Sequence, residues 1–224
     1  MKDPPMTPDR LIARHPVLYH MADARNWASI ERFGLLSTSS LLDRYAVSGS
    51  ERSGLESSHR PQTVEIADPK FGPAYVRDQK PLNPEVLPDC LVDMTPQAWL
   101  ETLNGRVFFW PDPDRLGRML KSYLDREQAI FEVDTRRLLD RHGDRVQLSH
   151  INSGFAGRAY KPAPRGSGTF QPLDRYADNA KNAVAEVTVP GAVPDIFDLT
   201  IRVVGRQRGR PDRLIWGEDL PREG

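Results

Sequence analysis

The sequence has a single cysteine, Cys90, among its 224 residues. One cysteine cannot form a disulfide within the chain, and no Cys/His spacing resembles a zinc site. We therefore expect Cys90 to behave as a small buried hydrophobic residue, and we expect no bound metal.

The chain also lacks net charge and long apolar runs. Its 31 basic residues equal its 31 acidic ones, whereas proteins that coat nucleic acid through a global positive field are usually basic. A local basic groove remains compatible with this balance. No apolar run approaches the roughly 18 residues that a membrane span requires, and residues 1–5 lack the apolar core of a signal peptide. We expect a cytoplasmic protein that makes no membrane contact.

Twenty prolines and sixteen glycines indicate short elements separated by many turns. The expected strands and helices follow no regular βαβ rhythm, and nothing matches a phosphate-binding or dinucleotide glycine motif. This pattern favours an α+β fold with a split, mixed β-sheet core and short flanking helices. We predict a flexible N-terminus over residues 1–9 and one domain over residues 10–220.

A predicted strand over residues 17–20 ends on the pair Tyr19-His20. A helix over residues 24–33 follows, because its apolar positions recur at helical spacing, and Gly34 supplies the stop. A neutral imidazole at a strand end can hydrogen-bond a ribose hydroxyl or an amide. The alternative is that His20 ties two loops together.

A second predicted strand, residues 183–189, carries Glu186 among apolar, β-prone residues. Alternation would place Glu186 and Thr188 on one face, with Val187 and Val189 on the other face toward a core. A half-buried carboxylate in such a strand needs a partner or a function. The alternative is that Glu186 occupies a solvated face.

The run 106–110 is the most strand-like segment, and its continuous apolar character suggests burial on both faces. Its aromatic residues Phe108, Phe109 and Trp110 could stack on a planar ring, although most such strands are core. Arg60 and Arg77 are candidate anion ligands because guanidinium groups bind phosphate oxygens in a fork. The alternatives are that each arginine is an ordinary surface residue, which is the commoner case, or that Arg77 pairs with Asp78 or Glu85.

The order of these segments resembles the DNA-modifying ADP-ribosyltransferase toxins known as DarT and, more broadly, the diphtheria-toxin-like transferase fold. Three segments carry the resemblance, which are Leu18-Tyr19-His20-Met21 with Gly34-Leu35-Leu36-Ser37, Arg106-Val107-Phe108-Phe109-Trp110-Pro111, and Ala185-Glu186-Val187-Thr188-Val189-Pro190. The chain is also similar to a group of uncharacterised bacterial proteins that share Arg-Asp-Gln-x-Pro, Val-Phe-Phe-Trp and Ile-Asn-Ser-Gly segments.

The resemblance implies an NAD-dependent ADP-ribosyltransferase that moves ADP-ribose from NAD to a macromolecular acceptor such as DNA or RNA, releases nicotinamide, and has an antitoxin partner. It implies two catalytic residues, Glu186 and Arg60, and five NAD-binding residues, which are Tyr19, His20, Ser37, Arg77 and Phe109. His20 and Glu186 must then converge on one cleft. Two alternatives stay open: a catalytically degenerate module that binds a nucleotide or a partner, and an NAD-using enzyme similar to RNA 2′-phosphotransferases.

Overall fold

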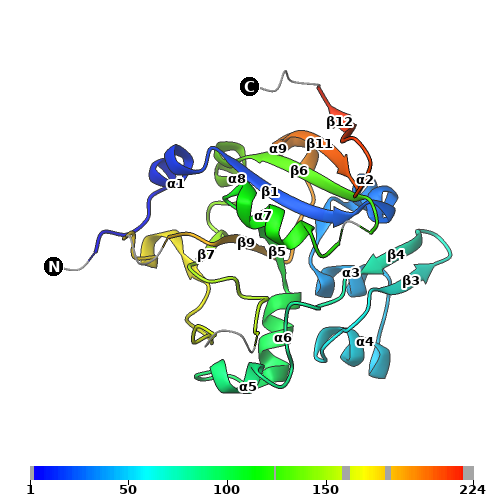
Figure 1. The fold of residues 1–224 in the computed structure, drawn as a ribbon, viewed down its shortest axis with the longest axis horizontal. Coiled ribbons are helices and arrows are strands. Elements are labelled where there is room, and N and C mark those ends of the chain that lie inside the picture. Colours follow the sequence, from blue (N-terminus) through cyan, green and yellow to red (C-terminus); the bar gives the residue numbers. More distant parts are fainter. Residues whose placement is uncertain (1–2, 124, 158–161, 180–182, 219–224) are drawn as a thin grey trace.

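The computed structural model describes residues 3–123, 125–157, 162–179 and 183–218 (Figure 1). Short helices are interspersed with antiparallel β-sheets, which confirms the α+β class. The helices are α1 Pro8–Arg14, α2 Trp27–Phe33, α3 Thr38–Arg44, α4 Gly49–Glu56, α5 Leu87–Cys90, α6 Pro96–Asn104, α7 Pro113–Leu120, α8 Thr135–His142 and α9 Ile196–Leu199, with 3-10 turns η1 Ala24–Asn26 and η2 Leu173–Arg175.

Twelve strands complete the described chain. They are β1 Val17–Asp23, β2 Leu35–Leu36, β3 Val64–Asp68, β4 Gly72–Val76, β5 Arg106–Phe109, β6 Gln128–Asp134, β7 Gln147–Ser149, β8 Gln171–Pro172, β9 Glu186–Pro190, β10 Ala192–Val193, β11 Thr200–Arg206 and β12 Arg213–Gly217.

The core sheet is split in two, as the sequence predicted. One four-stranded sheet has the order β1-β6-β11-β12 and the other has the order β5-β9-β7-β8. Their edge strands β1 and β5 meet where Tyr19 and Trp110 exchange backbone hydrogen bonds of 2.9 and 2.8 Å. Figure 1 shows β1 and β6 crossing above β5, β9 and β7.

The prediction of a mixed sheet was wrong, because the strand pairs of both sheets are antiparallel in the described residues. Parallel pairs need a long crossover connection, usually through a helix that covers the sheet. Antiparallel strands need no such crossover. The segment 207–212 joins β11 directly to its antiparallel neighbour β12.

The largest apolar cluster draws on residues from Met6 to Val203, so both ends of the chain contribute to one core. Val187 and Val189 of β9 are fully buried in it, as alternation predicted. Cys90 is also buried, in a second cluster around α6. On β5, Val107 and Phe109 belong to the main cluster while Phe108 packs on the second one. Both faces of β5 are therefore covered, as its continuous apolar run predicted.

The N-terminal segment follows a packed, extended path, in contrast to the flexible one that its prolines suggested for residues 1–9. The side chain of Met6 is only 2% exposed, and its backbone N–H donates to the carbonyl oxygen of Tyr176 at 2.9 Å. Thr7 caps α1, which begins at Pro8. Residues 1–2 lie outside the described part of the chain.

The turn at Gly34 brings the end of helix α2 close to strand β10. Helix α2 ends at Gly34, whose φ of +72° is a left-handed conformation that glycine tolerates and other residues avoid. A Cβ atom there would lie 2.5 Å from backbone atoms of Val193 and Pro194. This close approach lets β2 pair with β10. Ile196 and Leu199 bury one side of the short helix α9, and strand β11 begins directly after it at Thr200.

Candidate functional site

A cavity of about 890 Å³ lies where β1, β5 and the start of β9 approach one another. Helix α7, the segment after β4 and the segment after β7 complete its walls. This volume falls in the range of roughly 300–1,000 Å³ typical of small-molecule sites.

His20 and Glu186 both line this cavity. His20 comes from β1 of the first sheet and Glu186 from β9 of the second. The convergence that the sequence required is therefore present in the structure, and it arises because the edge strands of the two sheets meet.

Glu186 is 3% exposed, and its carboxylate is only partly satisfied. The backbone N–H of Ser153 donates to Oε1 at 3.1 Å, while Oε2 is buried without a hydrogen-bond partner among the described residues. Burial raises the pKa of Glu186 to about 7, an effect that Ser153 and the positive charge of Arg165 oppose. The carboxyl group can therefore hold or release a proton near neutral pH.

Arg165 holds the segment that carries Ser153. Its guanidinium is almost fully buried, and it donates to the carbonyl oxygens of Ser153 at 3.0 Å and Phe155 at 2.8 Å. This arrangement fixes the N–H of Ser153 beneath Glu186. Asn152, Gly154 and Phe155 of the same segment line the cavity.

The imidazole of His20 lies between the rings of Phe109 and Phe131, with centroid distances of 5.7 and 6.0 Å. Its Nδ1 lies 2.8 Å from the carbonyl oxygen of Phe108, which can only accept, so Nδ1 carries the proton. Burial lowers the pKa of His20 to about 4, and the nearby charge of Arg77 acts in the same direction. The ring is therefore neutral at pH 7, and its Nε2 is a hydrogen-bond acceptor.

Three residues expected to bind NAD do not line the cavity. Phe109 is fully buried in the main core, and it is Phe108 whose side chain reaches the cavity wall. Tyr19 packs beside Trp110 on the opposite side of β1 from His20. Ser37 caps α3, because its Oγ accepts from the backbone N–H of Ser40 at 3.1 Å. The side chains of Tyr19, Ser37 and Phe109 therefore lie away from the cavity in which the NAD site was expected.

Arg60 lines the cavity, but each of its three side-chain nitrogens already donates to a protein group. Its Nε donates to the carbonyl oxygen of Arg77 at 3.1 Å, and its terminal nitrogens donate to the carbonyl oxygen of Leu55 and to Oδ1 of Asn104. Burial lowers the pKa of Arg60 to about 10. Arg60 therefore joins α4, α6 and the segment after β4 through these three hydrogen bonds.

Arg77 also lines the cavity, close to His20. One terminal nitrogen donates to Oε1 of Gln128 at 3.0 Å, and the guanidinium lies 4.9 Å from the ring centre of Tyr123. No other hydrogen bond of its side chain is found within the described ranges. Arg77 thus retains donors that a ligand in the cavity could use.

Helix α7 contributes a wall of the site that the sequence interpretation missed. Arg115, Arg118, Met119 and the following Ser122 line the cavity, and positions spaced i, i+3, i+4 and i+7 share one helix face. The sequence contains a clue to this wall. Leu116 and Leu120 are buried against the core, and the two arginines lie on a different side of the same helix. The positive charge of Arg115 also opposes the rise that burial causes in the pKa of Glu186.

The segments shared with the uncharacterised bacterial group also meet at this cavity. Arg77 and Pro81 of the first, Phe108 and Trp110 of the second, and Asn152 of the third are all lining residues. The fold and site define an α+β protein whose split sheets enclose a pocket with a buried carboxylate and a neutral imidazole.

The family model described as a family of unknown function (DUF7002) matches residues 16–200, most of the chain, so the protein belongs to this family. The matched range contains every residue that lines the cavity. No curated protein matches the chain. Among the described residues there is no group of His, Cys, Asp or Glu side chains suited to a metal ion. The helices in those residues are also too short or too polar to cross a membrane.

Proposed function

We propose that this protein is an NAD-dependent ADP-ribosyltransferase. The observation that carries the proposal is the unpartnered Oε2 of Glu186 at the wall of a cavity that His20 also lines. A buried carboxylate oxygen without a partner costs free energy in the folded state. Such a cost is common where the group interacts with a ligand during a reaction.

In the proposed reaction the bond between the nicotinamide nitrogen and the ribose C1′ breaks, and its electron pair leaves with nicotinamide. Positive charge develops on the ribose, and the ionised carboxylate of Glu186 stabilises it. The acceptor nucleophile then forms a bond to C1′, and its proton passes to Glu186 or to water. The low-dielectric surroundings that raise the pKa of Glu186 also strengthen its interaction with that cation.

The other residues fit the substrate. Nε2 of neutral His20 can accept a hydrogen bond from a ribose hydroxyl, because Nδ1 is held by Phe108. The ring of Phe108 offers an apolar wall, and Arg77 offers donors for a phosphate oxygen. The proposed acceptor is a macromolecule such as DNA or RNA.

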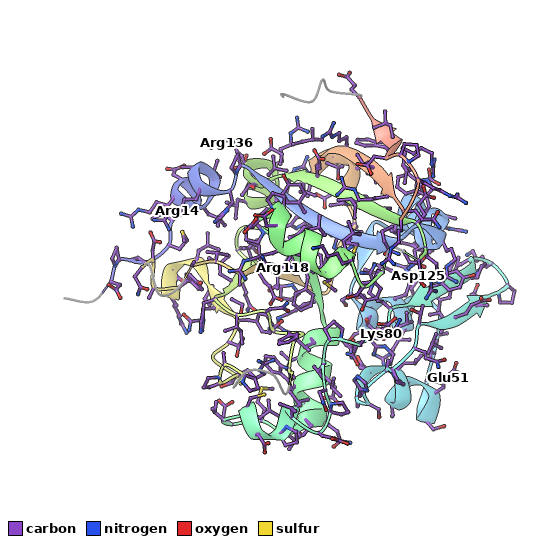
Figure 2. All side chains as sticks on the ribbon, viewed as in Figure 1. Arg14, Glu51, Lys80, Arg118, Asp125 and Arg136 are labelled. Carbon is purple, nitrogen blue, oxygen red and sulfur yellow. The ribbon has the colours of Figure 1, made fainter. Side chains whose placement is uncertain are left out.

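The first experiment measures nicotinamide release from NAD by the purified protein, with DNA, RNA and protein added in turn as acceptors. We expect Glu186→Gln to abolish transfer while it leaves NAD affinity within about twofold, because the amide keeps the size of the side chain but not its charge. The matched control is Glu51→Gln, an exposed glutamate on α4 (Figure 2). Transfer by Glu186→Gln at the wild-type rate would remove Glu186 from the mechanism.

The rate should also depend on pH. Only ionised Glu186 can stabilise the cation, and its pKa is about 7. Transfer should therefore rise as the pH increases from 6 to 8 and then level off. A pH-independent rate over this range would contradict the assigned role.

One observation favours a second candidate, a nucleotide-binding module without catalysis. Arg60, which the resemblance made catalytic, donates to protein groups from each of its three side-chain nitrogens. Such a module would bind NAD without releasing nicotinamide. An RNA 2′-phosphotransferase-like enzyme would instead need an RNA carrying a 2′-phosphate, which can be added as a further acceptor in the same assay.

A further inference from the structure

The cavity face of α7 carries two arginines one helical turn apart. Arg115 and Arg118 line the cavity, and the other side of the helix is anchored by Leu116 and Leu120. Figure 2 shows Arg118 near the middle of the molecule, on helix α7, which packs against β1 of the first sheet. The apolar anchor fixes the orientation of the helix, so the two guanidinium groups are held toward the cavity.

The cavity wall contains six basic residues but only three acidic ones. Two of the six already make hydrogen bonds within the protein. Arg60 is bound as described above, and the terminal nitrogens of Arg106 donate to the carbonyl oxygen of Thr102 at 2.7 Å and to Oε1 of Gln147 at 2.9 Å, while its Nε is buried without a partner among the described residues. Lys80 lies 3.4 Å from Oδ2 of Asp78.

The three acidic residues do not neutralise the remaining cations. Asp23 is paired with Arg25 at 2.7 Å. Asp78 accepts from the hydroxyl of Tyr123 at 2.8 Å and faces Lys80. Glu186 is partly protonated near neutral pH. Within the described part of the chain, the side chains of Arg115 and Arg118 make no hydrogen bond or ion pair, so positive charge is concentrated on this face of α7.

We propose that Arg115 and Arg118 bind the diphosphate group of a nucleotide that occupies the cavity. Guanidinium groups form paired hydrogen bonds with phosphate oxygens, and residues spaced i, i+3 on a helix lie about 5–6 Å apart at Cβ. Two adjacent phosphates can therefore contact both arginines at once. Arg115 is half-buried near Glu186 and Arg118 is exposed at the rim, so the diphosphate lies between the reacting ribose and the cavity mouth.

This assignment rests on the proposed function only for the identity of the nucleotide. It replaces Arg60 as the phosphate ligand, because each side-chain nitrogen of Arg60 already donates to a protein group. Binding of the diphosphate by Arg115 and Arg118 does not require the bond between nicotinamide and ribose to break.

The test is calorimetric titration of the full chain with ADP-ribose, followed by the variants Arg115→Gln, Arg118→Gln and the double variant. We expect each single variant to weaken ADP-ribose binding about tenfold or more, and Arg→Lys at the same positions to recover part of the loss. The matched control is Arg136→Gln. Arg136 is an exposed arginine on α8 that lies at another edge of the molecule (Figure 2), and its replacement should leave affinity unchanged. Inorganic pyrophosphate should compete with ADP-ribose for the wild-type protein.

Three results would overturn the assignment. These are equal ADP-ribose affinity in the double variant and the wild type, no ADP-ribose binding by the wild type at millimolar concentration, and loss of binding only for a short single-stranded oligonucleotide. The last result would mean that α7 contacts a polymer backbone instead. If ADP-ribose binding depends on both arginines but nicotinamide is never released, the proposed transferase activity fails while this assignment stands.

Discussion

At the scale of single residues, Glu186 and His20 are displaced from their ordinary protonation behaviour in opposite directions. The pKa of Glu186 rises from 4.5 to about 7, and that of His20 falls from 6.5 to about 4. Both changes keep a buried group neutral, and burial is the main cause of each. The two groups therefore give the site a pair of neutral side chains at mildly acidic pH, and a carboxylate with a neutral imidazole at higher pH.

The raised pKa of Glu186 has a consequence for stability. Between pH 4.5 and about 7 the folded protein holds a proton on Glu186 that the unfolded chain has lost, so this group stabilises the fold at low pH and the contribution disappears as the pH rises. Glutamine does not titrate. We therefore expect the free energy of unfolding of Glu186→Gln, relative to that of the wild type, to increase by about 2–3 kcal/mol as the pH rises from 5 to 8.

Urea unfolding of both proteins at pH 5 and pH 8 measures this difference. His20 contributes with the opposite sign, because its stabilisation is lost as the pH falls from 6.5 toward 4. That contribution is present in both proteins and cancels in the comparison. A difference in unfolding free energy that stays constant with pH would show that Glu186 titrates normally.

At the scale of elements, the turn at Gly34 determines how α2 and β2 approach the strand β10. Alanine at this position would have to adopt a φ of +72°, and its Cβ would lie 2.5 Å from the backbone of Val193 and Pro194. We expect Gly34→Ala to destabilise the protein by about 3 kcal/mol or more, of which about 1–2 kcal/mol comes from the backbone conformation alone.

Gly209→Ala is the matched control for this prediction. Its φ of +73° is nearly the same, but no atom lies within 4 Å of the position of its Cβ. It should cost only the conformational part, about 1–2 kcal/mol. Equal unfolding free energies for the two variants in urea would mean that the contact with β10 contributes nothing.

The elements also show what a sequence can and cannot predict. Alternation correctly placed Val187 and Val189 in the core, because one face of β9 is uniformly apolar. It could not decide between Phe108 and Phe109, because β5 is apolar throughout and both of its faces are covered. On α7, Leu116 and Leu120 are buried, but what the rest of the helix faces depends on strands far away in the sequence.

The same limit applies to the arginines. Arg60 was a reasonable anion ligand from its residue type, and only the positions of Leu55, Arg77 and Asn104 reveal that each of its side-chain nitrogens donates to the protein. Hydrogen bonds between distant segments leave no periodic pattern in a sequence. The convergence of His20 and Glu186 was predicted because the resemblance supplied the spatial arrangement that composition and spacing do not contain.

At the scale of the whole molecule, the cavity belongs to neither sheet alone. His20 comes from the first sheet and Glu186 from the second, and the two sheets touch through the backbone pair Tyr19–Trp110. A ligand that contacts both residues would therefore link the two halves. At a concentration one hundred times its Kd it would stabilise the folded state by about 2.7 kcal/mol.

Hydrogen exchange provides a test of this linkage. With saturating ADP-ribose, we expect slower amide exchange in segments from both halves of the molecule, at residues 18–22 of β1, at residues 151–155 beside Glu186, and along α7. The β3–β4 hairpin beyond Tyr75 should be much less affected, because only the end of β4 lines the cavity. Glu186→Gln should show the same protection, since it is expected to bind the ligand. Protection confined to one sheet would place the ligand outside the shared cavity and would separate His20 from Glu186 in function, because a single bound nucleotide could not then contact both.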